Sequence, residues 1–434
     1  MPNLPPEIVT DILSRLPVKA LRRFRCVSKP WRSLIDSKDF VKLHLHQSTK
    51  TNSNRCLLVE DTLLDAFAVD LDSFERLDLG DPPLHDHGMA NSCNGLVLAV
   101  SDTPLLWNPS TRKFKELPPT PLDPPGDVKV YVNELYGFGY DSKSDDYKVV
   151  RVTEVGDGPD GEYLYSETKI YSLKSNSWKR VSDYPHILPS GKRVWGVYLN
   201  DALHTVVKHC HHCESIMAFD LGTAEHHELP RPDLTGENVG VASVEVMGGY
   251  LTALVPRNMN RSEIWVMKEY GVKESWTKLL CFAPPMPEPY MNLTPLAYSN
   301  NGDEVLLNYD GRCLPAYSLR KQAVRIVDLP GLVPPFYNVA CFATSFYAEV
   351  YVGSLVSLDS PSEDDGSEKQ SVQGQVNAKK DKNNRDEFLS VGFKLVYLFM
   401  TLLSYSQVLV GASGDEEEIS WNVSMELFNR CGVE

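Results

Sequence analysis

The most chemically capable stretch of this chain is HCHHC, residues 209–213, and three further histidines lie near it in the sequence. Thiolate and imidazole groups bind zinc, and a Cys-x-x-Cys pair has the spacing of one zinc knuckle. A structural zinc site takes four ligands, usually from two such pairs, and only one pair is present. Because the stretch lies between two predicted strands, a polar turn is the competing interpretation, and we predict no metal and no cofactor. The candidate ligands, should a metal bind, are Cys210, Cys213, His209 and His212.

No other stretch has the pattern of a catalytic centre. The chain contains no glycine-rich phosphate loop, no serine nucleophile elbow and no His-Glu-x-x-His pair. No cysteine has the local sequence of a thioester-forming ligase, and the acidic pair Asp145-Asp146 is typical of a solvated turn. The sequence therefore indicates a protein that is not an enzyme. A metal-dependent enzyme is the alternative, and it depends on the HCHHC stretch.

The composition excludes several classes of function. The 434 residues have a formal net charge of −15, whereas a nucleic-acid-binding chain needs a basic surface. Nine scattered cysteines, an odd number, argue against a disulfide framework. The N-terminus lacks the apolar stretch of a secretory signal. We therefore expect no nucleic-acid partner and a cytoplasmic and/or nuclear location.

Three short helices are predicted within residues 1–45. Pro5 and Pro6 favour a helix start, Pro17 ends that helix, and Ser28 can cap the third one. Their apolar residues, in order, are Ile8, Ile12, Leu13, Leu16, Leu21, Phe24, Trp31, Leu34 and Ile35. Helices this short cannot enclose a core of their own, so their apolar faces need partner surfaces.

Residues 55–358 are predicted to form a succession of short β-strands with a loose internal repeat. An aromatic strand, a polar turn and a second strand recur about every 50 residues, as in LLWNPSTRKFKELP and KIYSLKSNSWKRV. The aromatic anchors are Trp107, Tyr171, Phe219, Trp265 and Tyr317. A period near 50 residues is typical of a β-propeller blade, whereas a two-sheet sandwich has no reason to repeat in this way. We therefore predict an all-β, propeller-like (kelch-like) domain.

About six irregular blades are predicted. Residues 55–81 form an incomplete first blade, and the other five begin near Gly88, Asn133, Arg193, Gly240 and Leu293. The strand-like run Phe336–Leu358 could pair with the first blade and close the ring. Closure removes the exposed sheet edges that otherwise invite aggregation.

The stretch LPPEIVTDILSRLPVKALRRFRCVSKPWRSLI, residues 4–35, closely resembles the F-box in its plant form. The resemblance implies binding to a SKP-type adaptor and, through it, to a cullin-based ubiquitin ligase. The implied adaptor-binding positions are Leu4, Pro5, Ile8, Ile12, Leu16, Pro17, Val18, Leu21, Phe24, Val27 and Trp31. One departure is Asp39, where the family often has proline, and it affects only the exit from the motif.

Four segments of the strand region resemble the plant F-box-associated interaction domain. They are SCNGLVLA, LLWNPSTRKFKELP, YGFGYDSKSDDYKVVRV and WVMKEYGVKESWTKL. The sequence departs from the family at Asp201, where glycine is usual, and at Thr205, where tryptophan is usual. The resemblance implies a domain that captures a protein substrate. The leading hypothesis is thus the substrate-recognition subunit of a SKP–cullin–F-box ubiquitin ligase, with a non-ligase propeller scaffold as the alternative.

The substrate is expected to bind loops at one end of the ring, since binding residues concentrate on surface loops. The long predicted loops are 118–130, 156–165, 184–192, 208–214 and 284–292. The individual substrate-binding residues are not predicted, and the candidate loops are those near Tyr131, Tyr163, Tyr184, His211 and Tyr290. For any single loop, the alternative is that its length is tolerated at the surface and has no binding function, and we weigh the two interpretations equally.

The remaining segments divide the chain further. We predict a linker at 46–54, a disordered polar segment at 359–387, and a hydrophobic segment with an acidic tail at 388–434. The run Phe388–Ala412 is long enough to span a bilayer, although Lys394 and Gln407 weaken that interpretation. A docked helix or strand and an accessory extension are the alternatives to a membrane anchor.

Overall fold

The computed structural model describes residues 5–61, 66–80, 82–84, 88–122, 131–156, 163–181, 183–186, 188, 195–210, 213–234, 240–258, 261–283, 293–329 and 346–359. The side chains of residues 131, 163, 164, 208–210 and 213 are outside this description. Leu4, His211, His212, Tyr290 and residues 360–434, which include the predicted polar and hydrophobic tail segments, also lie outside it. No helix in the described ranges is both long and apolar enough to cross a membrane.

The described N-terminal region is helical, as predicted. Its helices are α1 (Pro6–Ser14), α2 (Val18–Phe24), α3 (Lys29–Asp36) and α4 (Lys38–Thr51). Pro6 occupies the first turn of α1, where its missing N–H costs nothing, and Pro17 is the N-cap of α2. Ser28 caps α3, because its Oγ accepts a hydrogen bond from the Trp31 N–H.

The linker predicted at 46–54 is shorter in the structure, because α4 continues to Thr51 and residues 52–54 connect it to β1. Ser37 caps this helix by accepting a bond from the Phe40 N–H, and Asn52 ends it in the left-handed conformation at φ +53°. The most buried residues of α4 are Phe40, His44 and Ser48, spaced four residues apart. Two of these three are polar, which weakens the apolar periodicity that marks a helix in the sequence.

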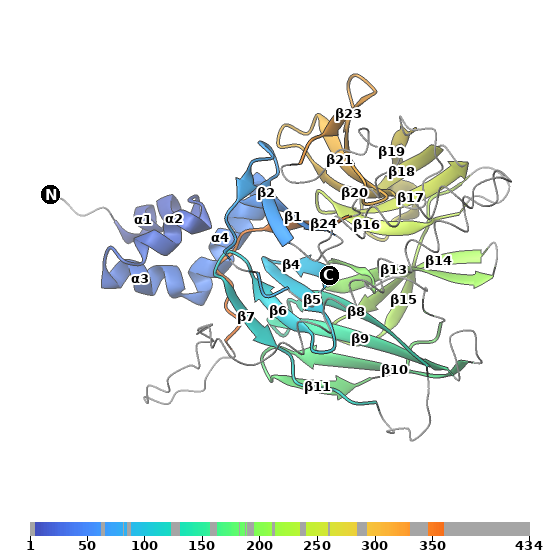
Figure 1. Cartoon of the computed structure of the whole chain (residues 1–434), viewed down its shortest axis with the longest axis horizontal. Helices are drawn as coiled ribbons and strands as arrows, with labels where there is room; N and C mark the ends of the chain where they lie inside the picture. The colour runs from blue at the N-terminus through green and yellow to red at the C-terminus, as the bar shows by residue number, and fades with distance from the viewer. Residues whose placement is uncertain are drawn as a thin grey trace, which may run out of the picture. The chain divides into compact units, whose positions relative to one another are not determined.

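The strands of the described ranges form six four-stranded antiparallel sheets, which confirms the propeller prediction (Figure 1). Blade 1 contains β24 (Phe346–Val352), β1 (Arg55–Asp61), β2 (Ala66–Asp70) and β3 (Arg76–Leu77). Blade 2 contains β4 (Gly88–Cys93), β5 (Leu96–Val100), β6 (Leu105–Asn108) and β7 (Lys113–Glu116). Blade 3 contains β8 (Tyr131–Asp141), β9 (Asp146–Gly156), β10 (Tyr163–Ser172) and β11 (Ser177–Arg180).

The other three blades repeat the pattern. Blade 4 contains β12 (Val197–Leu199), β13 (Ala202–Cys210), β14 (Cys213–Asp220) and β15 (His226–Leu229). Blade 5 contains β16 (Ser243–Met247), β17 (Tyr250–Asn258), β18 (Arg261–Met267) and β19 (Trp276–Phe282). Blade 6 contains β20 (Leu293–Tyr298), β21 (Glu304–Tyr309), β22 (Leu314–Ser318) and β23 (Ala323–Val327). The strands β24, β4, β8, β12, β16 and β20 contact one another in cyclic order, so they form the inner ring.

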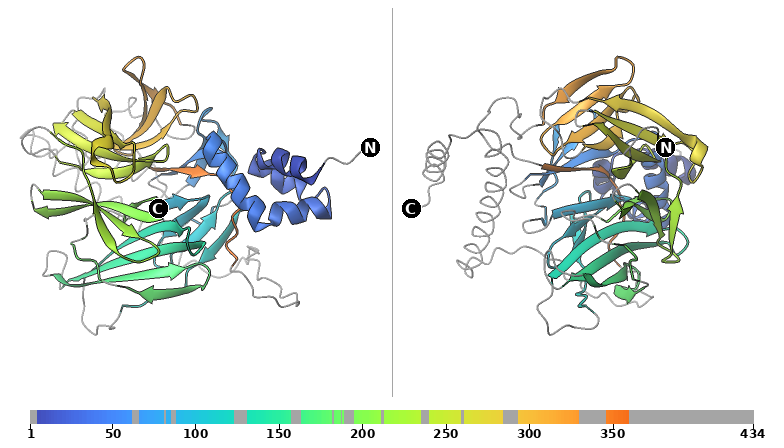
Figure 2. Two further views of the ribbon diagram at one scale, coloured as in Figure 1. Left: turned by 180° about the vertical axis from the view of Figure 1, so that it is seen from behind. Right: turned by 90° about the vertical axis from the view of Figure 1, so that its right-hand side faces the viewer.

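The ring is closed by its last strand, as the sequence predicted. β24 pairs antiparallel with β1 over seven residues, from Arg55 opposite Val352 to Asp61 opposite Phe346. In Figures 1 and 2 the orange β24 lies beside the blue strands of blade 1. Blade 1 therefore consists of strands from the two ends of the propeller sequence, and neither end can complete it alone.

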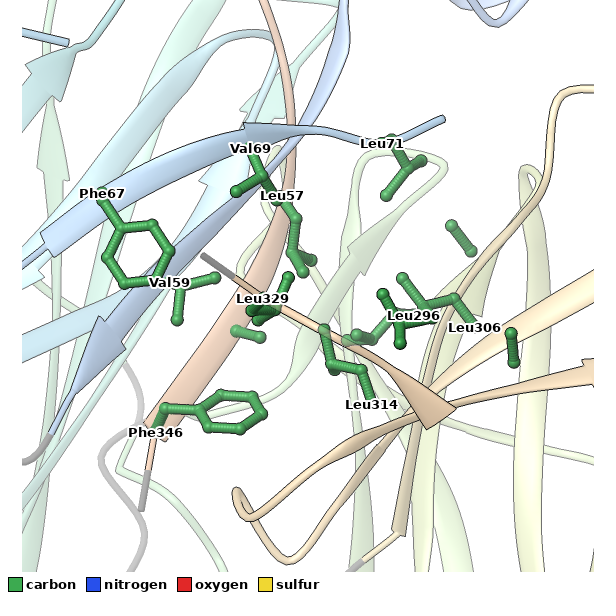
Figure 3. Close-up of a cluster of buried hydrophobic side chains, with 14 residues drawn as sticks. Leu57, Val59, Phe67, Val69, Leu71, Leu296, Leu306, Leu314, Leu329 and Phe346 are labelled. Carbon is green, nitrogen blue, oxygen red and sulfur yellow. The ribbon is translucent and has the colours of Figure 1, made fainter. Parts of the chain in front are cut away.

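A hydrophobic cluster seals the junction between blade 6 and blade 1 (Figure 3). Blade 1 contributes Leu57, Val59, Phe67, Val69, Leu71 and Phe346, and blade 6 with its exit contributes Leu296, Leu306, Leu314 and Leu329. Leu57, Val59 and Val69 are fully buried. Phe346 belongs to β24, so the closing strand supplies part of the core that joins the first and last blades.

The aromatic anchors of the repeat occupy the third strand of their blades. Trp107, Tyr171 and Phe219 are buried, and each is paired across the sheet with the residue seven positions later in the fourth strand. The Tyr171 and Trp178 rings lie 5.4 Å apart as one such pair. The repeat in the sequence thus corresponds to one aromatic residue in each of blades 2 to 6, which packs between neighbouring sheets.

Asp201 occupies the turn between β12 and β13, where the family usually has glycine. Its φ of +62° lies in the left-handed region, which is costly for a residue with a Cβ. The carboxylate accepts bonds from the N–H and Oγ–H of Ser142 in blade 3, at 3.1 and 2.5 Å. These inter-blade bonds offset the conformational cost, so this departure from the family pattern is accommodated.

A buried carboxyl group helps to hold the closing strand against blade 2. Glu349 of β24 accepts a bond from the Ser92 N–H, and burial raises the pKa of its carboxyl to about 7. The Ser92 hydroxyl lies 3.1 Å from the same carboxyl oxygen and donates to Val350 O at 2.7 Å. The hydroxyl of Tyr347 lies 2.7 Å from Ala90 O and 3.1 Å from Glu349 Oε2. Since a phenol has one proton, only a protonated Glu349 satisfies both contacts, by donating to Tyr347 while Tyr347 donates to Ala90.

This geometry predicts a pH dependence of stability. The folded pKa of Glu349 is raised above its ordinary value of 4.5, so its contribution to stability is full below about pH 4.5 and is lost as pH rises through about 7. Glu349→Gln should therefore raise the free energy of unfolding at pH 8 by about 1–3 kcal/mol, and leave it nearly unchanged at pH 4.5. Denaturant unfolding at the two pH values measures this difference. The exposed Glu274→Gln is the matched control, and an equal effect of Glu349→Gln at both pH values would contradict the assignment.

Candidate interaction sites

The helical region exposes an apolar face. Ile8 and Ile12 lie one turn apart on α1, and each leaves 47% of its surface exposed. Val27, just after α2, is 62% exposed, and Pro5 and Pro17 are also exposed. Large apolar side chains left in water cost free energy that a partner surface can recover. These five residues are the part of the predicted adaptor-binding set that is open to a partner.

The rest of that set is partly or wholly inside the helical region. Leu16, Phe24 and Trp31 are half-buried against its core, and the Phe24 and Trp31 rings meet edge to face with centroids 5.6 Å apart. Val18 and Leu21 are 5% and 0% exposed, so in the free chain they are core positions of the motif: Leu21 belongs to the helical core, and Val18 lies beside Gly353. Leu4 lies outside the described residues.

The core behind this face is small and includes a histidine. Leu13, Leu21, Ile35 and Phe40 are its buried members. His44 of α4 is fully buried, and its Nε2–H donates to Leu16 O at 2.9 Å, a carbonyl at the break between α1 and α2. Burial lowers the pKa of His44, which keeps the ring neutral at physiological pH. Sequence reasoning missed this residue, because a lone histidine in a polar-looking segment gives no signal of a structural role.

The two ends of the propeller are distinct. In each antiparallel blade the turns after the first and third strands lie at one end, here called the turn end. The connections after the second and fourth strands lie at the other, here called the loop end. The five loops predicted from the sequence follow β7, β9, β11, β13 and β19, which are second or fourth strands, so the strand ends that precede them lie at the loop end. The predicted loop 208–214 is mostly strand, because β13 continues to Cys210 and β14 begins at Cys213.

The helical region contacts the turn end. Arg22 of α2 donates to Ser110 O in the β6–β7 turn at 2.9 Å. Lys42 of α4 pairs with Asp145 in the β8–β9 turn at 2.7 Å. The helical region thus contacts the end of the propeller opposite to the loop end.

The predicted substrate-contact residues separate into three groups. Tyr184 is 3% exposed and packs edge to face on Trp195, so its own side chain is closed to a partner, and the role of the loop near it stays a prediction. The backbones of Tyr131 and Tyr163 both lie opposite Gly156, at the loop end of blade 3. His211 and Tyr290 fall outside the described residues.

The histidine–cysteine stretch spans the β13–β14 hairpin, in which Cys210 and Cys213 are backbone partners. The side chains of its candidate ligands lie outside the described residues. Two of the neighbouring histidines already have other roles. His204 is fully buried between Val197 O and the Tyr270 hydroxyl, and His226 packs on aromatic rings; burial lowers the pKa of each to about 4. Among the described residues no group of three or more potential ligands could hold a metal ion.

These roles make the metal hypothesis testable. Removal of divalent cations with a chelator is expected to leave the melting temperature of the full chain unchanged, because His204 is hydrogen-bonded through both ring nitrogens and His226 packs on aromatic rings. Thermal unfolding with chelator, and again with added zinc, measures this. A fall in melting temperature that zinc reverses, and that Cys210→Ser/Cys213→Ser abolishes, would contradict the expectation.

The fold and the exposed helical face together define an interaction protein: a closed propeller with a small helical docking region. Residues 73–358 match the F-box associated beta propeller domain, and residues 1–43 match the F-box domain. The chain belongs to the plant F-box proteins that have an F-box-associated β-propeller domain. This pair of domains fits a substrate-recognition F-box protein, and an F-box implies a SKP-type adaptor partner in general.

Two relatives from Arabidopsis thaliana illustrate the similarity. The F-box protein CPR1 is 33% identical over 432 residues, an alignment that covers 91% of this chain and 100% of the relative. The F-box/kelch-repeat protein At3g23880 is 31% identical over 300 residues, which cover 64% of this chain and 79% of the relative. Both domains predicted from sequence motifs are therefore confirmed at the level of the family.

Proposed function

We propose that this chain is the substrate receptor of a SKP–cullin–F-box ubiquitin ligase. The single observation that supports it most is the exposed apolar face of Ile8, Ile12 and Val27 on a matched F-box joined to a closed propeller. The F-box binds the adaptor, and the propeller holds a protein substrate for ubiquitination and proteasomal degradation. The chain itself is not catalytic, and it contributes proximity between the substrate and a ubiquitin-charged enzyme.

Burial of the exposed face supplies adaptor affinity. Covering a large apolar side chain contributes on the order of 1–3 kcal/mol, and a few such anchors dominate a typical interface. Exposed basic residues surround the helices, among them Lys19, Arg23 and Lys29, although the whole chain has a net charge of −15. A local basic patch of this kind favours an acidic partner surface and speeds the encounter with it.

The loop end is the proposed substrate site. The second and fourth strands of the blades end there, and it lies away from the turn end that the F-box helices contact. A substrate there does not compete with the adaptor for surface. The assigned chemistry is recognition of a protein surface, since no described cluster at this end resembles a metal site.

We also propose a cytoplasmic and/or nuclear site of action. Cys26 and Cys281 are exposed free thiols, and Cys56, Cys93 and Cys313 are buried free thiols, which fits a reducing compartment. Cell fractionation tests this, and recovery of the chain in a secreted or membrane fraction would contradict it.

Proximity labelling in cells with the proteasome inhibited tests the proposed function. Proteins that the receptor targets should be labelled by the wild-type chain and should accumulate when the proteasome is blocked. The same proteins should be labelled, but not degraded, with a chain that lacks the exposed F-box face. A propeller scaffold outside any ligase, the second candidate, would label partners whose abundance does not depend on the F-box.

A further inference from the structure

The segment Gly353–Asp359, here called the closing strap, follows β24 and leaves the propeller at its turn end. One further backbone hydrogen bond extends the pairing of β24 with β1 into the strap: the Gly353 N–H donates to Asn54 O at 2.7 Å. Asn54 lies in the connection between α4 and β1. The strap therefore begins where the F-box helices join the propeller, although about 300 residues of chain separate the two.

One side of the strap contacts the F-box. Leu355 packs against the helical core formed by Leu13, Leu21, Ile35 and Phe40. Gly353 lies next to Val18, whose Cγ2 is 3.6 Å from the position that a Cβ would take there. The small F-box core is thus completed by a residue from the far end of the propeller sequence.

The other side of the strap is fixed to blades 2 and 3. Asn108, fully buried at the end of β6, donates from Nδ2 to Val356 O at 2.8 Å and to Ser354 O at 3.3 Å. Val356 and Leu358 are buried in the cluster between these blades, against which Val41 and Leu45 of α4 also pack. Ser354 is fully buried, and Gly95 leaves the space for it, since a Cβ at Gly95 would lie 2.1 Å from Ser354 Oγ.

The direct polar contacts between the F-box helices and the blade turns should hold the helices on the propeller less strongly than the buried contacts of the strap do. The Arg22–Ser110 bond is exposed, and the side chains of Lys42 and Asp145 are 57% and 40% exposed. Exposed polar pairs contribute little to stability. Besides the strap and these exposed pairs, Val41 and Leu45 of α4 pack on the cluster between blades 2 and 3, and two domains joined by a contact this small are expected to move relative to each other.

We propose that the closing strap fixes the F-box helices on the propeller, with Leu355 as a positioning residue that sets where a bound substrate lies relative to the adaptor. The effect of Leu355 on substrate position rests on the proposed function, because ubiquitin transfer requires the substrate lysines to be within reach of the charged enzyme. The attachment itself is a property of the free chain and is testable without any ligase.

Two native cysteines suit the test. Cys26 in the F-box and Cys281 in blade 5 are exposed, whereas Cys56, Cys93 and Cys313 are buried. Spin labels on Cys26 and Cys281 of the full chain report the distance between the two domains by pulsed electron paramagnetic resonance. The remaining cysteines are replaced by serine, namely Cys210, Cys213, Cys341 and Cys431.

The wild-type chain should give a narrow distance distribution. Leu355→Ala should broaden it at least about twofold, and Leu355→Met, which keeps the apolar contact, should leave it narrow. Arg22→Ala/Lys42→Ala removes the exposed polar contacts and should also leave it narrow. Equal distributions for Leu355→Ala and wild type, or equal broadening by the polar variant, would overturn the proposal.

A second variant covers the case in which Leu355→Ala unfolds the F-box. Val356→Ala/Leu358→Ala loosens the strap from the blades and leaves Leu355 in the helical core, so it should broaden the distribution while adaptor affinity stays within about twofold. Adaptor affinity is measured by calorimetry on unlabelled chains with purified SKP-type adaptor. A narrow distribution for this variant would overturn the proposal as well. Failure of the wild-type chain to bind adaptor would instead overturn the proposed function and leave the distance result intact.

Discussion

Ile8→Asp/Ile12→Asp is expected to lower the affinity of the chain for a SKP-type adaptor at least about a hundredfold. Two carboxylates on an apolar contact face would each be desolvated without a partner, and a hundredfold loss is about 2.7 kcal/mol, well within that cost. Both residues are 47% exposed, so the fold should be retained, and circular dichroism should show unchanged helix content and melting temperature. Calorimetric titration with purified adaptor measures the affinity.

The matched control places the same two charges on the propeller. Leu77 and Val272 are each 39% exposed, so Leu77→Asp/Val272→Asp changes charge and surface apolarity to a similar extent without touching the F-box. This variant should bind adaptor as the wild type does. Equal affinity of the F-box variant and the wild type would show that the α1 face is not the contact surface.

A chain that ends at Ser345 is expected to lose the cooperative propeller fold. Its blade 1 would lack β24, which leaves the seven-residue edge of β1 unpaired and removes Phe346, Ala348 and Tyr351 from two buried clusters. Loss of this packing should lower the free energy of unfolding by more than about 5 kcal/mol, which is comparable to the whole stability of a typical domain. Thermal unfolding followed by near-UV circular dichroism should show no cooperative transition.

A chain that ends at Asp359 is the control for this truncation. It keeps β24 and the closing strap and removes only residues 360–434, so its transition should lie within a few degrees of the wild-type value. A wild-type transition in the shorter chain would contradict closure by β24.

The propeller could be predicted because its determinants are local and repeated. Each anchor such as Trp107 or Tyr171 is an aromatic residue in a third strand, followed by a polar turn, and the pattern returns once per blade. Ring closure could be predicted because an unpaired strand edge in the first blade would invite aggregation, so that blade needs a further strand to pair with. The helix α4 could not be predicted in this way, because its buried face uses His44 and Ser48 in place of apolar residues.

The candidate site was only partly predictable. The F-box motif contains both contact and core positions, and periodicity cannot distinguish Ile8, which is exposed, from Leu21, which is fully buried. Tyr184 was assigned to a surface loop but packs inward on Trp195, because a loop can fold back between two blades. The role of Leu355 depends on a contact between distant parts of the sequence, for which a single sequence gives no signal.

Assembly with both adaptor and cullin tests the central claim most directly. Purified full-length chain, SKP-type adaptor and cullin are mixed, and the complex is measured by size-exclusion chromatography with light scattering. The account predicts one complex that contains all three proteins with the wild-type chain and none with Ile8→Asp/Ile12→Asp. A wild-type chain that remains separate from adaptor and cullin, or a variant that assembles as the wild type does, would contradict its role as the receptor of such a ligase.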